Sequence, residues 1–233
     1  MKPLLLLLLL VAASCAELNK ALQSTSTGKG ELTENEVIKG LKAALEKGIK
    51  AASSSASKED GYFGNSLIMI AFPPDAREVE KKLRQIGMGK EVDKFVLTLN
   101  RAAEKASAKA VDVFVGAIIQ MSVQDAWGIL RGEEDAATQY LIKTTSQQLN
   151  TEFRPIVKVA LDQVSATRYY TDLVTTYNKI PFVTKVNPDL EEYATAKAID
   201  GLFTLVAKEE AKIRKDPLAR TSEILQRVFG HTE

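Results

Sequence analysis

Apolar residues recur at helical spacing along most of the chain between Thr33 and Gly230, and this pattern predicts an all-α fold. Thr33 and Glu36 have the spacing of a capping box, so the first helix is expected to begin there. Its apolar positions are Val37, Ile38, Leu41, Ala44, Leu45 and Ile49. The serine-rich stretch 51–61 that follows is typical of a loop.

The middle of the chain predicts a series of helices separated by capping and stop signals. Asp75 is expected to cap a short helix that Gly87 ends. Helical spacing then continues from 90 to 121, with a break expected near Ser107. Ser122 and Asp125 form another capping signal, for a helix that ends at Gly132 and includes Trp127, an expected core residue.

The second half of the chain predicts further helices. Residues 135–179 suggest two or three, interrupted at Pro155 and near Thr167. An Asn-Pro pair at 187–188 starts a long helix to about 214, and an Asp-Pro pair at 216–217 starts the last one. Residues 62–72 are the exception, because they fit an extended strip lying on helices. We therefore expect one domain at 33–230, a bundle of about eight helices with a short extended segment.

The first residues change the picture of where this domain resides. Lys2, an apolar run at 4–11 and small residues before Cys15 have the layout of an export signal over 1–14. The small residues before this only cysteine resemble a bacterial lipobox, which implies that Cys15 carries a lipid and begins the mature protein. Residues 15–32 then form a lipidated N-terminus and flexible tether. By resemblance to lipoprotein sorting signals, Ala16 implies the outer membrane of a Gram-negative bacterium, and we expect the domain to face the periplasm.

Charge and residue usage exclude several classes of function. Removing residues 1–14 takes away one lysine and no acid, which leaves 30 basic and 30 acidic residues and argues against nucleic-acid binding. The only histidine, His231, is the third residue from the end, so no histidine-based triad or usual zinc ligand set is expected. No phosphate loop is present either. We expect no cofactor, no metal site and no catalytic residues.

Carboxylates and arginines form one candidate site. On a helical projection of 187–214, Glu209 falls inside the apolar stripe and Glu210 at its edge, so Glu209 needs a partner if it is buried. Arginines on this and neighbouring helices are candidates to supply it. The predicted buried polar network comprises Asn100, Arg101, Glu104, Glu209, Arg214 and Arg220. Three interpretations stay open: a structural network, the polar floor of a ligand pocket, or paired-carboxylate catalysis.

Aromatic residues form a second candidate site. Tyrosine combines an apolar ring with a polar tip, which suits half-wet binding surfaces. The candidate groove residues are Phe153, Tyr169, Tyr170, Tyr177 and Tyr193. The alternative is ordinary helix packing with the hydroxyl groups at the surface.

Five segments of the chain resemble one bacterial family, known as domain of unknown function 4197. They are LNRAAEKA (99–106), SVQDAWGIL (122–130), GEEDAATQY (132–140), LEEYATAKAIDGLF (190–203) and EEAKIRKDPLART (209–221). The resemblance implies an exported helical protein, often a lipoprotein, and implies no activity or catalytic residue.

Three functions remain as hypotheses. The first is a non-enzymatic interaction module that docks on another envelope protein, and the second is a carrier that binds an apolar small molecule or acyl chain within the bundle. The third is a hydrolase that uses carboxylates alone. An enclosed dry cavity would favour the carrier, whereas an exposed apolar patch would favour docking.

Overall fold

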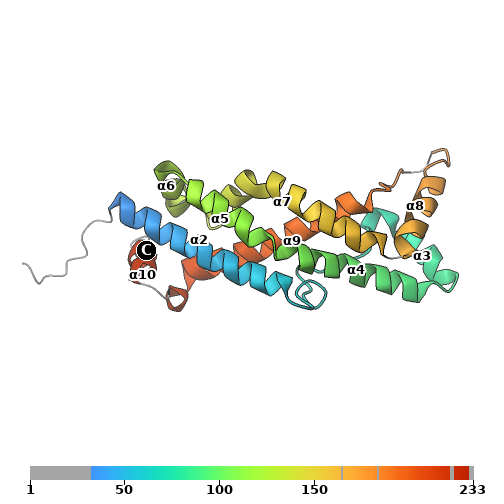
Figure 1. Cartoon of the computed structure of the whole chain (residues 1–233), viewed down its shortest axis with the longest axis horizontal. Helices are drawn as coiled ribbons and strands as arrows, with labels where there is room; N and C mark the ends of the chain where they lie inside the picture. The colour runs from blue at the N-terminus through green and yellow to red at the C-terminus, as the bar shows by residue number, and fades with distance from the viewer. Residues whose placement is uncertain (1–32, 164, 183, 221–222, 231–233) are drawn as a thin grey trace, which may run out of the picture. The chain divides into compact units, whose positions relative to one another are not determined.

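The computed structural model describes residues 33–163, 165–182, 184–220 and 223–230 of the chain. Two long helices form the axis of the helical unit Glu34–Glu233. These helices are α7 (Ala136–Asp162) and α9 (Leu190–Lys215). They run antiparallel, because Glu210 near the end of α9 contacts Ala137 at the start of α7, while Arg154 pairs with Glu191 at the other end. Figure 1 shows both helices running through the unit.

The remaining helices pack around this axis in two groups (Figure 1). One half contains α2 (Glu34–Ser57), α5 (Ala110–Gln120), α6 (Val123–Arg131) and α10 (Glu223–Gly230). The other half contains α3 (Arg77–Gln85), α4 (Gly89–Ser107) and α8 (Ser165–Tyr177). Short 3₁₀ helices, η1 (Pro74–Ala76) and η2 (Pro217–Ala219), precede α3 and α10.

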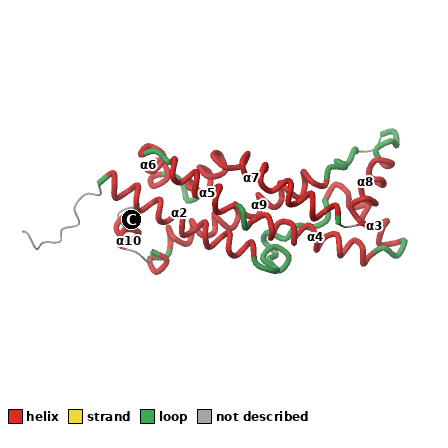
Figure 2. The backbone as a smooth tube through the Cα atoms, viewed as in Figure 1, coloured by secondary structure: helices red, strands yellow, loops and turns green. Residues whose placement is uncertain are grey.

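The all-α prediction is confirmed. The described ranges contain nine α-helices and no strand (Figure 2). Residues 62–72 are non-helical, but the extended strip expected there is mostly turns, because the backbone amides of Asn65, Ile68 and Met69 bond to carbonyls three or four residues earlier. Gly87, at a positive φ of 90°, ends the α3 region, and Ser122 and Asp125 form the predicted capping box at α6.

Several helix boundaries differ from the prediction. Asp75 lies inside η1 and makes no capping hydrogen bond, and Asp189, not Asn187, caps the long helix α9. α2 continues to Ser57 through the serine-rich stretch, because Ala52, Ser53 and Ala56 are buried and tertiary packing overrides low helix propensity. Pro155 lies inside α7 and does not end it. Proline has no amide hydrogen, so the Thr151 carbonyl lacks its usual helical hydrogen bond. Pro155 and Thr151 are both exposed, so water can bind this carbonyl.

Aromatic rings fill the core in each half of the unit. Phe72, Phe95 and Tyr170 cluster where α4 and α8 meet, with ring centroids 5.3 to 6.3 Å apart. In the other half Phe114 of α5 meets Phe203 of α9 edge-on, with 5.7 Å between centroids. These contacts place the inner face of α5 firmly in the core.

Candidate docking surface

Asn100 and Glu104 on α4 hold the irregular segment 62–72 in place. The Asn100 side chain accepts a hydrogen bond from the Ile70 amide and donates one to the Ile70 carbonyl, both at 2.8 Å. Glu104 Oε1 accepts from the Tyr62 amide at 3.1 Å and the Phe63 amide at 3.3 Å. Arg101 completes the cluster with a 2.7 Å ion pair to Glu104. These side chains supply the backbone of a non-helical segment with hydrogen-bond partners that it would otherwise lack.

Tyr62 fixes the same segment from inside. Its hydroxyl donates to the Ala198 carbonyl at 2.5 Å and receives a hydrogen bond from Ser107 at 3.2 Å. Burial raises the pKa of the Tyr62 phenol, so the group stays a neutral donor. A side chain at Gly201 would place its Cβ 2.7 Å from the Tyr62 ring, and only glycine leaves room for this contact.

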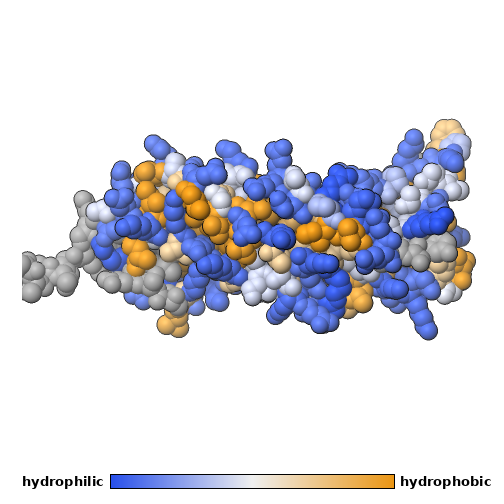
Figure 3. All heavy atoms as spheres, in the orientation of Figure 1, coloured by the Kyte–Doolittle hydropathy of each residue, from blue (hydrophilic) through white to orange (hydrophobic). Residues whose placement is uncertain are grey.

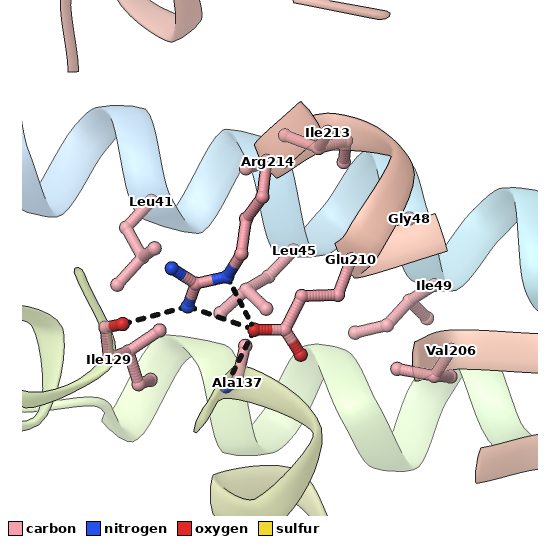
Figure 4. A pocket seen from close by; sticks show the side chains of 11 residues that line it. Leu41, Leu45, Gly48, Ile49, Ile129, Ala137, Val206, Glu210, Ile213 and Arg214 are labelled. Atoms are coloured by element: carbon pink, nitrogen blue, oxygen red, sulfur yellow. Dashed lines mark hydrogen bonds and ion pairs between the residues drawn. The ribbon is translucent and has the colours of Figure 1, made fainter. Parts of the chain in front are cut away.

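Glu210 has the role that the sequence had suggested for Glu209. Its carboxylate accepts hydrogen bonds from the Ala137 and Thr138 amides, at 3.0 and 2.8 Å, and from the Thr138 hydroxyl at 2.8 Å. Arg214, one turn along α9, pairs with it at 2.9 Å (Figure 4). Glu210 thereby binds the unpaired amides at the start of α7, where the helix dipole also favours a negative charge.

The prediction that Glu209 is the buried carboxylate is wrong. Its side chain is 26% exposed, and its ion pair is a 3.9 Å contact with Lys212 on the surface of the same helix. The predicted network is also divided. Asn100, Arg101 and Glu104 form one cluster, and Glu210 and Arg214 form another. Arg220 donates to the carbonyls of Ile213 and Arg214, so it closes the end of α9.

Among the candidate aromatics whose side chains the structure describes, two are buried in the core and so do not line a groove. Phe153 is fully buried, and Tyr170 is 1% exposed in the core, with its hydroxyl donating to the Asn187 carbonyl at 3.2 Å. Tyr193 is half-buried and donates to the Ala71 carbonyl. Tyr177 is half-buried, and the side chain of Tyr169 lies outside the described part of the chain. Helix packing accounts for Phe153 and Tyr170, and burial raises the pKa of Tyr170 and Tyr193.

An apolar cavity lies between α2, α6, α7 and α9, beside the Glu210–Arg214 pair (Figure 4). Its volume of about 30 Å³ holds roughly two water molecules. An acyl chain does not fit there. The lining residues are Leu41, Ala44, Leu45, Gly48, Ile49, Ile129, Ala137, Val206, Glu210, Ile213 and Arg214.

Helix α5 is apolar on almost every side, yet the side that faces away from the bundle is exposed to solvent. Its inner residues are buried against α2 and α7, as expected for such a helix. On the outer side Ile119 is 69% exposed, and Val111 and Val115 are half-buried. Figure 3 shows a band of hydrophobic residues along α5 on the face toward the viewer. We call Val111, Asp112, Val115, Gly116 and Ile119 the α5 outer face.

Gly116 leaves an open space on this face. A Cβ built at Gly116 would meet no atom within 4 Å, although glycine in a helix costs about 1 kcal/mol relative to alanine. Packing within the described chain therefore gives no reason for a glycine here. Close approach of another backbone is one use of such a position.

A groove of about 460 Å³ runs beside the α5 outer face, between α5 and α7. Tyr140 bridges the two helices, with its hydroxyl 3.3 Å from the Ala117 carbonyl. Burial, with a smaller contribution from Asp125, raises the pKa of Tyr140 and keeps it neutral. The groove is lined by Val113, Gly116, Ala117, Gln120, Asp125, Tyr140, Lys143, Thr144, Thr145 and Gln148. Its rim can therefore donate and accept hydrogen bonds.

The sequence contained a signal for this surface that the prediction did not use. The segment AVDVFVGAIIQ at 110–120 has nearly continuous apolar residues, whereas an exposed helix has a polar side. The break predicted near Ser107 is confirmed, since α4 ends there and α5 begins at Ala110, but the prediction did not consider which sides of 110–120 would be covered. Trp127 was also placed in the core, but it is half-buried and stacks under Arg131, whose guanidinium lies 4.4 Å from the ring centroid.

Two features of the described residues bear on metal binding and on membrane insertion. No cluster of three or more histidine, cysteine, aspartate or glutamate residues suited to a metal ion occurs among them. No single helix in these ranges has the length and apolar character of a membrane span, although α5 and α6, bent by 107°, pass that test as a pair.

Comparison with known proteins gives one match. A family model described as a protein of unknown function (DUF4197) matches residues 31–230. No curated protein and no solved structure matches this chain.

Proposed function

Because the chain belongs to a family of unknown function, DUF4197, its own surface is the guide to its role, and we propose that it is a non-enzymatic docking module of the cell envelope. The observation that carries this proposal is the α5 outer face. An apolar helix with one buried side and one exposed side gains stability when a partner covers the exposed side.

The chemistry of the face favours a helix of another protein as its partner. Asp112 lies exposed among the apolar residues, and a lipid bilayer would have to desolvate its carboxylate, whereas a protein can pair it with lysine or arginine. The open position at Gly116 admits a close backbone, and the adjoining groove offers polar groups. We expect the partner helix to present small and apolar residues and one basic residue opposite Asp112.

The location of the module is part of the proposal. Cys15 lies outside the described residues, and the support is the sequence pattern of an export signal that ends in a lone cysteine. We propose that the chain is exported and held by a lipid on Cys15 at the outer membrane, with the helical unit in the periplasm. Tethering would keep the α5 outer face at a high effective concentration near envelope partners.

The two alternative functions receive less support. The carrier hypothesis needs an apolar chamber, and the apolar cavity beside Glu210 has about 30 Å³. The hydrolase hypothesis needs a carboxylate that is free to move protons. Glu104 and Glu210 each accept backbone amide hydrogen bonds and pair with an arginine, an arrangement that serves structure.

The proposal can be tested by site-specific photo-crosslinking in cells. A photoreactive phenylalanine analogue replaces Ile119 in the full chain, and Val159 on α7, 55% exposed, is the control position. We expect a discrete adduct with one other protein from position 119 and none from position 159. An adduct with the mass of two copies of this chain, or equal labelling from both positions, contradicts the proposal.

Charge reversal then tests whether the partner recognises this face. Asp112→Lys should abolish the adduct, because it places two positive charges opposite each other. Glu152→Lys is the matched control, since Glu152 is an exposed acid on α7. An adduct that survives Asp112→Lys would mean that the partner lies elsewhere.

A further inference from the structure

The loop between α8 and α9 presents apolar residues to solvent. Ile180 is 52% exposed, Phe182 is fully exposed, and Pro181 between them is exposed as well. Figure 1 shows this loop standing away from the helices, and Figure 3 shows hydrophobic residues at its tip. We call residues 179–182 the loop tip.

The backbone at the tip adopts a conformation that is unfavourable for its residue. Phe182 has a φ of 62°, a region that glycine or asparagine occupies far more readily than a bulky aromatic residue. Strain of this kind persists only where the surrounding structure imposes it, and it is concentrated at functional sites. A glycine would relieve the strain, and because Phe182 is fully exposed, burial in the fold does not explain a phenylalanine at this position.

The base of the loop is tied, so the tip is presented in a defined way. The Asn178 side chain donates to the Val186 carbonyl at 2.6 Å and accepts from the Val186 amide at 2.9 Å. Val186 is buried, and the Tyr170 hydroxyl holds the next residue through the Asn187 carbonyl. These contacts anchor both ends of the loop to α8 and the core.

Two lysines flank the apolar tip. Lys179 and Lys185 are both exposed, and residues 178–186 contain no acid, so the segment carries two positive charges. An apolar tip between lysines suits the boundary of an anionic bilayer, where rings enter the acyl region and ammonium groups meet phosphates. The α5 outer face differs, because it includes an exposed acid, Asp112, in the first turn of the helix.

We infer that the loop tip is a contact site for an anionic lipid bilayer. Phe182 and Ile180 enter the interface, and Lys179 and Lys185 bind lipid phosphates. A protein partner is less well matched, because the three exposed apolar side chains of the tip, Ile180, Pro181 and Phe182, lie between two lysines in the sequence. The contact adds a second attachment to the membrane, in the half of the unit that contains α8.

Tryptophan fluorescence in vesicles tests this inference with the full chain. Phe182→Trp is made in a Trp127→Phe background, so that one tryptophan reports from the tip. The protein is incorporated into phosphatidylcholine vesicles with or without phosphatidylglycerol, and both contain bromine-labelled acyl chains as quenchers. Leu67→Trp in the same background is the control, because Leu67 is 64% exposed and has no lysine beside it.

We expect the Phe182→Trp chain to be quenched by brominated lipid in the anionic vesicles and much less in the neutral ones, while the Leu67→Trp chain stays unquenched in both. Replacing Lys179 and Lys185 by glutamine should lower the equilibrium constant for tip contact about 25-fold, since each lysine contributes about fivefold. An unquenched Phe182→Trp chain in anionic vesicles overturns the inference. So does protection of its tryptophan from a water-soluble quencher without lipid quenching, which would indicate that the tip is covered by this chain or by a second copy of it.

A second variant separates membrane contact from folding. Phe182→Gly relieves the positive φ, so its melting temperature should equal or exceed that of the parent chain. With Ile180→Trp as the probe, the same substitution should reduce lipid quenching. A large fall in melting temperature would show that Phe182 serves the fold, and unchanged quenching would show that it does not enter the bilayer.

Discussion

Glu209 and Glu210 are neighbours on α9, yet their environments differ in kind. Glu210 is 8% exposed and accepts hydrogen bonds from two backbone amides, a hydroxyl and Arg214. Removing one partner of a buried pair typically costs about 3–5 kcal/mol, whereas an exposed pair contributes about 0–1 kcal/mol. We therefore expect Glu210→Ala to destabilise the protein by about 3–5 kcal/mol and Glu209→Ala by less than about 1 kcal/mol.

Urea unfolding of the two variants measures this difference directly. Thr204→Ala, an exposed substitution on the same helix, controls for helix propensity. Losses of similar size for Glu209→Ala and Glu210→Ala would show that the start of α7 does not depend on the Glu210 carboxylate.

Asn100 gives a second prediction at the level of single residues. Asn100→Ala leaves the Ile70 amide and carbonyl without their side-chain partner, and an unsatisfied buried polar group costs about 1–3 kcal/mol. Hydrogen exchange of the Ile70 amide should become faster in this variant than in Thr98→Ala, which loses only a bond to its own helix. Unchanged exchange at Ile70 would mean that other contacts hold the segment.

At the level of elements, the capping box makes α6 sensitive to acid. The Ser122 side chain and, to a smaller extent, its backbone amide lower the pKa of Asp125 below the ordinary 3.8. A carboxylate with a lowered pKa stabilises the fold fully above its unfolded value, and this stabilisation is lost as pH falls through the folded value. Asp125→Asn should cost about 1 kcal/mol at neutral pH and progressively less below 3.8. A cost independent of pH would exclude the ionised carboxylate as its cause.

Local signals predicted elements well where the chain itself enforces them. Gly87 at positive φ and the Ser122–Asp125 box are set within a few residues, so the sequence contains the whole cause. The helix through Ser53 and the proline at 155 were misread, because the burial of Ala52, Ser53 and Ala56 decides the first outcome and the solvent exposure of Pro155 decides the second. A helical projection at roughly 100° per residue places Glu209 inside the apolar stripe and Glu210 at its edge. The projection cannot include the start of α7, whose backbone amides bind the Glu210 carboxylate.

The candidate surfaces show the same division. The α5 outer face was foreseeable from its continuous apolar residues, although only the fold reveals which side stays open. The loop tip was not foreseeable, because Phe182 in the sequence looks like any other connector residue and its exposure and φ emerge only from the fold.

For the whole molecule, attachment at Cys15 is a separate prediction. Cys15→Ser should prevent incorporation of labelled fatty acid and should shift much of the protein out of the membrane fraction. Ser14→Ala keeps the cysteine and a small neighbour, so it should leave labelling intact. A Cys15→Ser chain that is still labelled would place the lipid on another residue.

The central claim, that the α5 outer face binds a partner helix, is tested most directly by one substitution measured in two ways. Gly116→Ala fills open space on the free protein, so it should raise the free energy of unfolding by up to about 1 kcal/mol. The same methyl group should obstruct the partner and weaken crosslinking from position 119. Gly128→Ala on α6, whose Cβ would also meet nothing within 4 Å, should stabilise similarly and leave crosslinking unchanged. Gly116→Ala protein that is more stable and crosslinks as well as the parent chain would contradict the account.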